Sequence, residues 1–171
     1  MKVILYMATT PNGFIAKENG DSNWTSEADQ RRYDELSKSA GNVIIGRKTY
    51  EALKAQNLFP LPGRYNVVIT HQENLLTDSE NVLITNKTPQ EVLGHLQNKG
   101  FETAFVAGGG ELNGSFMAAG LLDELYLTIE PLVFGRGLKL FGDADFENKL
   151  ELIESTKLSD NELQLHYRVL K

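Results

Sequence analysis

The sequence predicts an α/β fold of three layers, in which helices cover both faces of a mixed and mostly parallel central sheet. Short apolar runs alternate with helical patterns along the chain, as expected for strand–helix–strand units. The runs at 43–45, 67–69 and 105–107 are apolar at every position, which is typical of parallel strands buried on both sides. Two later apolar segments, joined through Ser159-Asp160-Asn161, predict a C-terminal antiparallel hairpin.

Turn residues and helix signals give the expected bounds of the elements. The polar stretch 9–25 predicts a long loop, and the stretch 59–63, which contains two prolines and a glycine, predicts a turn. Pro89 near the start and Gly100 after the end delimit one helix, and Gly120 ends another. The expected strands are 2–8, 42–46, 66–70, 82–85, 103–107, 122–130, 150–157 and 163–171. The expected helices are 26–39, a short helix from about 48, 89–98 and 110–119.

Length and composition favour one globular domain over residues 1–171. Apolar residues make up 41% and charged residues 23%, so the chain can bury a core of its own. The net charge of -6 argues against a general affinity for nucleic acid or anionic membrane, although a local basic cluster could still hold an anionic cofactor. The absence of cysteine and the scattered histidines predict no disulfide and no metal site. No stretch approaches the roughly 20 apolar residues of a membrane span, and the expected location is the cytoplasm.

Two strand-to-helix junctions carry residues suited to phosphate. The three glycines at 108–110 open a helix whose free N–H groups attract anions, although a tight turn is an alternative reason for them. Gly-Arg-Lys-Thr at 46–49 could clamp a phosphate, or its cations could be ordinary surface residues. Neither junction is a standard nucleotide signature. Asn113 stands where the G-x-G-x-x-G fingerprint needs glycine, and strand-like Val and Ile replace the flexible stretch of a P-loop.

A carboxylate lies on the apolar face of the first expected helix. The spacing places Asp29 on one face with Tyr33, Leu36 and Ala40. Burial there would raise the pKa of Asp29 towards that of a useful proton donor. The alternative is purely structural, because Ser26-x-x-Asp29 also matches a capping box.

The loop and the turn supply two further candidates. A loop as long as 9–25 is usually functional, and Trp24 near its end is either a lid anchor or a core aromatic residue. Arg64 follows Pro60-Leu61-Pro62-Gly63. It could grip a carboxylate or phosphate through two parallel hydrogen bonds, or it could be an exposed residue of a surface turn.

Taken together, these motifs resemble dihydrofolate reductase over nearly the whole chain. Gly-Arg-Lys-Thr-Tyr-Glu at 46–51, Pro-Leu-Pro-Gly-Arg at 60–64, Val-Ala-Gly-Gly-Gly at 106–110 and Leu-Tyr-Leu-Thr at 125–128 look like that family's motifs in its order. Trp24 and Asp29 resemble its active-site tryptophan and acidic residue. The resemblance implies a dihydrofolate-reductase-like fold and an NADPH-dependent reductase.

The resemblance also implies a role for each matching position. Asp29 would act catalytically, supported by a hydrogen bond from Thr128. Thr70 and His71 would lie near the adenosine 2′-phosphate and favour NADPH, and the Gly108–Gly109 bond would be cis. The implied substrate contacts are Ala8, Trp24, Tyr33 and Arg64, the last meeting an anionic tail. The implied cofactor contacts are Ala16, Gly46, Arg47, Lys48, Thr49, Thr70, His71, Gly108, Gly109, Gly110, Glu111 and Leu112.

Other segments look more like the pyrimidine reductases of riboflavin biosynthesis. These segments are 9–16, 25–28 and 131–141, the last with Phe-Gly-Arg-Gly at its centre. Such reductases often form the C-terminal domain of a bifunctional deaminase–reductase, whose zinc cysteines are absent from this sequence. The chain therefore resembles a stand-alone member between the two branches. By the same analogy, the region 121–141 could pair two chains into a homodimer.

These resemblances imply hydride transfer from NADPH to a small-molecule pterin or pyrimidine substrate. One alternative is the 5-amino-6-(5-phosphoribosylamino)uracil reductase activity of riboflavin biosynthesis. A second is a non-catalytic NADPH-binding module. A third is a reductase of an unrelated carbonyl or quinone compound, because a fold does not determine its substrate.

Overall fold

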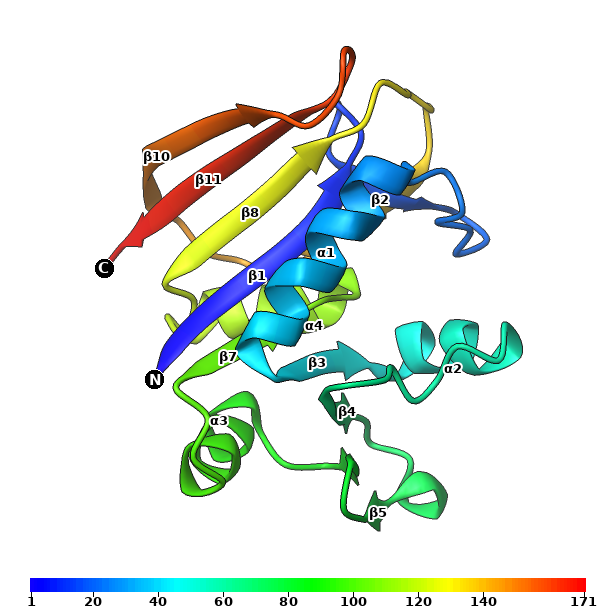
Figure 1. Ribbon diagram of the computed structural model, residues 1–171, viewed down its shortest axis with the longest axis vertical. Coiled ribbons are helices and arrows are strands. Elements are labelled where there is room, and N and C mark those ends of the chain that lie inside the picture. The colour runs from blue at the N-terminus through cyan, green and yellow to red at the C-terminus, as the bar shows by residue number, and fades with distance from the viewer.

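The computed structural model describes residues 1–171 and contains one large sheet and one small one (Figure 1). The strands are β1 (Lys2–Thr9), β2 (Phe14–Lys17), β3 (Asn42–Gly46), β4 (Tyr65–Ile69), β5 (Thr77–Asp78), β6 (Val82–Thr85), β7 (Thr103–Val106), β8 (Glu124–Ile129), β9 (Gly137–Lys139), β10 (Lys149–Lys157) and β11 (Leu163–Leu170). The helices are α1 (Glu27–Ala40), α2 (Arg47–Ala55), α3 (Pro89–Asn98) and α4 (Gly110–Ala118), with a 3-10 turn, η1 (Glu73–Leu75).

The large sheet has nine strands in the order β10-β11-β8-β1-β7-β3-β4-β6-β5. Neighbouring strands from β8 to β6 run parallel, whereas β11, β10 and β5 pair in antiparallel fashion. The predicted mixed, mostly parallel sheet and its closing hairpin are therefore confirmed. The continuous apolar runs lie in the central strands β3, β4 and β7, where both faces are covered.

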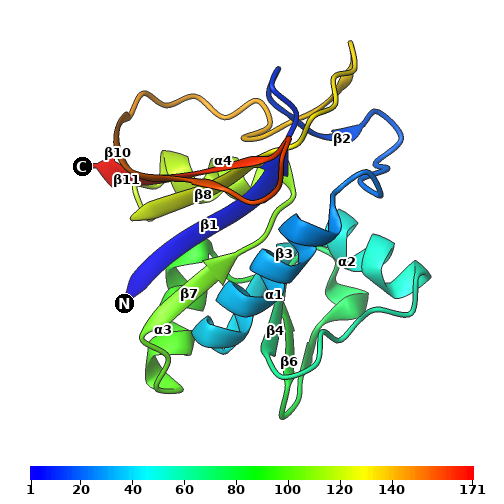
Figure 2. The same cartoon turned by 45° about the horizontal axis from the view of Figure 1, so that its top comes forward.

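Helices cover the two faces of this sheet in pairs. Tyr50 of α2 and Tyr33 of α1 pack with Phe105 on one face, and α1 lies in front of the sheet, alongside β1, in Figures 1 and 2. Leu96 of α3 and Phe116 of α4 belong to the core on the other face. The three-layer prediction is thus confirmed. No helix combines the length and the apolar character that a membrane crossing requires.

The prediction of one long loop over 9–25 was wrong in part. That stretch contains β2, which pairs with β9 as a separate two-stranded sheet. The short strands β5 and β9 and the turn η1 were also not predicted. These elements are too short to show a periodic pattern, and β2 depends on a partner far away in the sequence. The other bounds agree with the prediction within two residues.

Helix α4 lies so close to the end of β9 and the residues that follow it that two positions of the helix require glycine. A Cβ atom on Gly110 would overlap the carbonyl oxygen of Lys139, and one on Gly114 would overlap that of Phe141. The two glycines stand four residues apart and so share one helical face. The last of the three consecutive glycines therefore has a packing reason as well as a possible ligand reason.

Replacing the second of these glycines tests the close contact. Gly114→Ala is expected to lower the free energy of unfolding by about 1–3 kcal/mol, because the new methyl group overpacks the contact. Gly94→Ala is the matched control, since Gly94 lies inside α3 with no atom within 4 Å of its added Cβ. It should leave stability unchanged or raise it by up to about 1 kcal/mol. Urea unfolding followed by circular dichroism measures both, and equal effects would contradict the close approach.

Candidate active site

The predicted site residues gather mainly at one edge of the large sheet. Since the central strands are parallel, their carboxyl ends lie together, and ligands of such sheets bind beyond that edge. Ala8 and Thr128 are direct partners near the ends of β1 and β8. Gly46 ends β3, Thr70 follows β4 and Gly108 follows β7. The parallel topology thus brings together residues that are up to 120 positions apart in the sequence.

Asp29 lies in the first turn of α1 with only 4% of its surface exposed. The hydroxyl of Tyr6 donates a hydrogen bond of 2.7 Å to its Oδ1. The hydroxyl of Thr128 lies 3.2 Å from that of Tyr6, so the support expected from Thr128 reaches Asp29 through Tyr6. Gln164 of β11 donates from Nε2 to both hydroxyls, at 3.2 Å to Tyr6 and 3.1 Å to Thr128.

The structure separates the two interpretations of Asp29. Its backbone N–H donates to Ser26 Oγ at 3.0 Å, as the capping interpretation requires. However, the backbone N–H of Ser26 donates to Glu130 Oε1 at 2.9 Å rather than to Asp29. Glu130 completes the cap, and the Asp29 carboxyl group is available for chemistry.

Three carboxyl groups meet near the start of α1. Burial raises the pKa of Asp29, the Tyr6 and Thr128 hydroxyls oppose that rise, and the charge of Glu162 adds to it. Burial also raises the pKa of Glu130, and the nearby Asp29 and Glu162 charges raise it further. Glu130 and Glu162 flank the β8–β11 pair, in which Leu163 lies opposite Ile129. Asp29 is thus placed to hold a proton at a higher pH than an exposed aspartate would.

The amino ends of α2 and α4 converge beside this carboxyl cluster on the same edge. Their N-cap residues, Gly46 and Gly109, provide no side-chain cap, so the first N–H groups of both helices remain free. Gly46 N donates to Gly108 O at 2.7 Å, and a Cβ on Gly109 would lie 3.6 Å from Thr49 Oγ1. The Gly108–Gly109 bond is cis, as expected from the resemblance. Two uncapped helix amino ends form a site suited to an anion with two phosphates.

Two cations border these helix ends. Lys48 lies 3.4 Å from Glu111, and the Lys48 side chain is 65% exposed. Arg47 forms an ion pair of 2.7 Å with Glu51, one turn along α2. Both pairs lie at the surface and are therefore weak enough to exchange for a phosphate.

The remaining predicted cofactor residues differ in their exposure to solvent. His71 is exposed directly after β4, whereas Thr70 is buried and accepts a hydrogen bond of 3.1 Å from Gln72 N. Leu112 is buried below Gly46, where it packs in the core. Ala16 is buried in β2, opposite Leu138 of β9. Of these four residues, only His71 offers an exposed polar side chain.

Trp24 connects two parts of the structure: the loop that contains β2 and the segment before β9. Its Nε1 donates to Asp21 O at 3.2 Å, and its ring meets the edge of Phe134 at a centroid distance of 5.8 Å. Phe14 stacks on the same Phe134 at 5.6 Å. Two segments that resemble the pyrimidine reductases are therefore packed together. Tyr33, the other aromatic candidate, belongs to α1, and the centroid of its ring lies 5.6 Å from that of Tyr6.

Arg64 does not join the residues at the carboxyl edge. It precedes β4, and its side chain is only 2% exposed. Its guanidinium group donates to Ser37 Oγ at 2.8 Å and to Pro62 O at 3.0 Å, and it forms an ion pair with Asp34. These contacts fix the turn against α1. A substrate role for Arg64 stays a prediction, and a ligand would have to displace some of these bonds.

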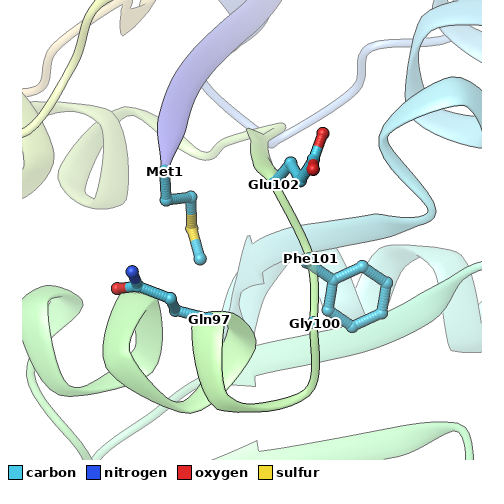
Figure 3. Close-up of a pocket in the computed structure, with 5 residues that line it drawn as sticks. All are labelled: Met1, Gln97, Gly100, Phe101 and Glu102. Atoms are coloured by element: carbon cyan, nitrogen blue, oxygen red, sulfur yellow. The ribbon is translucent and has the colours of Figure 1, made fainter.

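Two surface pockets lie near the end of the sheet opposite to the carboxyl edge. One of about 300 Å³ is lined by Met1, Gln97, Gly100, Phe101 and Glu102, with Met1 pointing towards Gln97 in Figure 3. A larger one of about 540 Å³ adjoins the 60–66 turn. Neither contains the carboxyl cluster or the paired helix ends, so we place the candidate site at the carboxyl edge.

The sequence interpretation missed Tyr6, Gln164, Glu130 and Glu162. It also missed Arg32, whose Nε donates to Gln164 Oε1 at 3.2 Å. Tyr6 is a polar residue within the apolar run of β1, and Gln164 alternates with apolar residues in β11. These positions are the only sequence signal, because a polar side chain in an apolar strand needs a partner. Which partner each residue meets depends on strand pairing across more than 100 positions.

Comparisons with known proteins point to one family. Residues 1–164 match the family model of the RibD C-terminal domain. The chain is 33% identical over 170 residues to the uncharacterized protein YwjB of Bacillus subtilis, covering 97% of each. It is 35% identical over 108 residues to the dihydrofolate reductase of Lactococcus lactis, covering 62% of this chain and 58% of that one. It is 26% identical over 171 residues to the riboflavin biosynthesis protein RibD of Bacillus amyloliquefaciens, covering 78% of this chain and 46% of RibD.

Two solved structures share the fold. One is the diaminohydroxyphosphoribosylaminopyrimidine deaminase/5-amino-6-(5-phosphoribosylamino)uracil reductase of Thermotoga maritima, with a TM-score of 0.82, 19% identity and coverage of 99% of this chain and 56% of that one. The other is the dihydrofolate reductase of Enterococcus faecalis complexed with NADP(H), with a TM-score of 0.73, 20% identity and coverage of 99% and 97%.

A substitution of Arg64 tests whether this buried cation is structural. Arg64→Met is expected to lower the free energy of unfolding by about 1.5–3 kcal/mol, because it removes several charged hydrogen bonds from a buried position. Arg31→Met is the control, since Arg31 is 69% exposed and forms a long surface ion pair with Glu27 at 3.6 Å. Its effect should stay within about 0.5 kcal/mol. Similar losses in urea unfolding would show that Arg64 is not a structural cation.

Proposed function

Because the chain belongs to the RibD C-terminal domain family, we propose that it is an NADPH-dependent reductase of a pterin or pyrimidine substrate. The observation that carries the proposal is the common position of two features. The uncapped amino ends of α2 and α4 lie at the same sheet edge as the buried Asp29 carboxyl group. A dinucleotide and a proton donor are the two components that such a reduction needs.

The residues at the helix ends fit the phosphates of NADPH. Free N–H groups after Gly46 and Gly109 would hold the pyrophosphate, and Arg47 and Lys48 would neutralise its charge. The exposed His71, which follows β4 at the same edge, could meet the 2′-phosphate. When bound, NADPH supplies a hydride from its nicotinamide ring.

Asp29 would supply the proton that completes the reduction. A C=N bond gains a hydride at carbon and a proton at nitrogen, and a carboxyl group of raised pKa can deliver that proton. Burial between α1 and the sheet leaves only 4% of Asp29 exposed, which limits the access of bulk water to the transfer. Tyr33 and Trp24 would border the substrate, and Ala8 leaves room for it beside Thr128.

The second candidate function is the pyrimidine reductase of riboflavin biosynthesis alone. The stacking of Phe14 on Phe134 favours it, because both residues belong to segments that resemble the pyrimidine reductases. A homodimer through the region 121–141 also stays a prediction. That region exposes Leu132, Val133 and Leu138, and light scattering would test the pairing by the mass in solution.

The reaction itself tests the proposal. The purified protein should oxidise NADPH, followed by absorbance, with dihydrofolate or with the deaminated ribosylamino-pyrimidine of the riboflavin pathway. Asp29→Asn should lower kcat at least about a hundredfold while the Kd for NADPH changes little, because only the proton donor is lost. Glu27→Gln, at a 92% exposed position in the same helical turn, is the matched control. Binding of NADPH without turnover of either substrate would favour a non-catalytic binding module.

The cofactor site has a test that does not require turnover. Lys48→Met should raise the Kd for NADPH about fivefold at low salt, since a surface cation–phosphate contact is lost, and the effect should shrink as salt is added. Lys54→Met is the control, because Lys54 lies in the last turn of the same helix, far from its amino end. Equal Kd values for the two variants, measured by fluorescence titration, would remove Lys48 from the site.

A further inference from the structure

The donor of each hydrogen bond that links Thr128, Tyr6 and Asp29 can be assigned by elimination. Tyr6 has a single hydroxyl hydrogen, which is directed at Asp29: its shortest bond, 2.7 Å, is to Oδ1, and the Asp29 carbonyl oxygen lies at 3.1 Å. In the 3.2 Å contact between Tyr6 and Thr128, the donor must therefore be Thr128. The chain of donation runs from Thr128 to Tyr6 to Asp29.

The orientation of the Gln164 side-chain amide decides which groups donate in this series of hydrogen bonds. Arg32 Nε donates to Gln164 Oε1 at 3.2 Å, and a guanidinium group can only donate. The amide must therefore turn its Nε2 towards Tyr6 and Thr128, where it donates to both. In the reverse arrangement, a proton on Oδ1 would be donated to Tyr6, and the Tyr6 hydrogen would turn to the Asp29 carbonyl oxygen, 3.1 Å away. The Tyr6 oxygen would then have to accept from Asp29, Thr128 and Gln164, although a hydroxyl oxygen has only two lone pairs. One buried donor would lose its partner, which is costly, so the reverse arrangement is disfavoured.

The second carboxylate oxygen of Asp29 is left for the ligand. Oδ2 accepts no hydrogen bond from the protein. It is also not among the fully buried side-chain atoms without a partner, which are Asn113 Oδ1 and Glu162 Oε2, so it keeps contact with solvent. Any proton that Asp29 carries is best placed on this oxygen.

We propose that Tyr6 and Gln164, oriented by Arg32, are positioning residues that keep Asp29 an acceptor at Oδ1 and place its transferable proton on Oδ2. The identity of the proton acceptor rests on the proposed reductase function. The direction of the hydrogen bonds does not, because it follows from the protein's own contacts.

Other charged and titratable groups act on the same carboxyl group. Glu162, before β11, raises the pKa of Asp29, and Glu130, after β8, carries a second carboxyl group close by. On α1 itself, Tyr33 is a titratable neighbour: burial raises its pKa, and the charge of Asp29 adds to that rise. On β1, burial raises the pKa of Tyr6, which therefore keeps its hydrogen. Tyr6 is thus the main donor that opposes the rise of the Asp29 pKa.

Removing the Tyr6 hydroxyl tests the proposal. In Tyr6→Phe the pKa of Asp29 should rise, because its ionised form loses a donor, and carboxyl-carbon NMR of the aspartates follows this without any substrate. The falling limb of kcat against pH should move to higher pH, since a proton donor works only while protonated. Maximal kcat should fall about tenfold, with a smaller change in KM, because the carboxyl group is no longer held in one orientation. Tyr126→Phe is the control, with a half-buried ring stacked on His166.

Arg32, at the outer end of this hydrogen-bond network, supplies a milder variant that should fold normally. Arg32→Met should shift the Asp29 pKa in the same direction, because the Gln164 amide is then free to turn. Arg168→Met, at a 55% exposed position near the other end of β11 where the arginine pairs with Glu151, should not shift it. An Asp29 pKa that is unchanged in both Tyr6→Phe and Arg32→Met, or that moves equally in the controls, would overturn the proposal. If the wild type reduces neither substrate but the NMR shifts occur, the proposed function fails and the positioning network stands.

Discussion

A carboxyl group buried beneath the first turn of a helix must find hydrogen-bond donors, and the site depends on how this is done for Asp29. Its Oδ1 takes the hydroxyl of Tyr6 from the neighbouring strand β1, and that hydroxyl is itself held by β8 and β11. Four elements are thereby joined around one oxygen. Because an unpartnered buried charge would be strongly destabilising, these contacts fix the position of α1 on the sheet as well as the chemistry of the carboxyl group.

The same edge also contains a site for negative charge that depends on backbone groups. Gly46 and Gly109 begin α2 and α4 without side-chain caps, and a 2.7 Å backbone bond from Gly46 to Gly108 holds the two junctions together. Free N–H groups attract phosphate, whereas the nearby carboxyl cluster repels it. A dinucleotide bound at the helix ends would therefore keep its phosphates away from Asp29, which suits a site in which only the reacting ring should approach the acid.

Part of the candidate site follows from local sequence. Glycines 108–110 and the stretch 46–49 could be identified because apolar runs precede them, and Asp29 because of its helical spacing. Arg64 shows where such reasoning ends. The sequence could not distinguish a substrate-binding arginine from a structural one, and only the fold shows Asp34 and Ser37 of α1 lying against its guanidinium group. Similarly, the capping pattern at Ser26 was found, but its partner proved to be Glu130, which is 104 positions away.

The sequence by itself determined the three-layer α/β fold and the strand ends that carry the candidate site residues, because apolar periodicity and glycine positions act over a few residues. Only the tertiary structure decided the β2–β9 pair and the packing of segment 139–142 on Gly110. It also decided the hydrogen-bond chain from Arg32 through Gln164 and Tyr6 to Asp29. The physical reason is that each of these contacts joins groups distant in the sequence, and a buried polar group does not reveal its partner until the chain has folded around it.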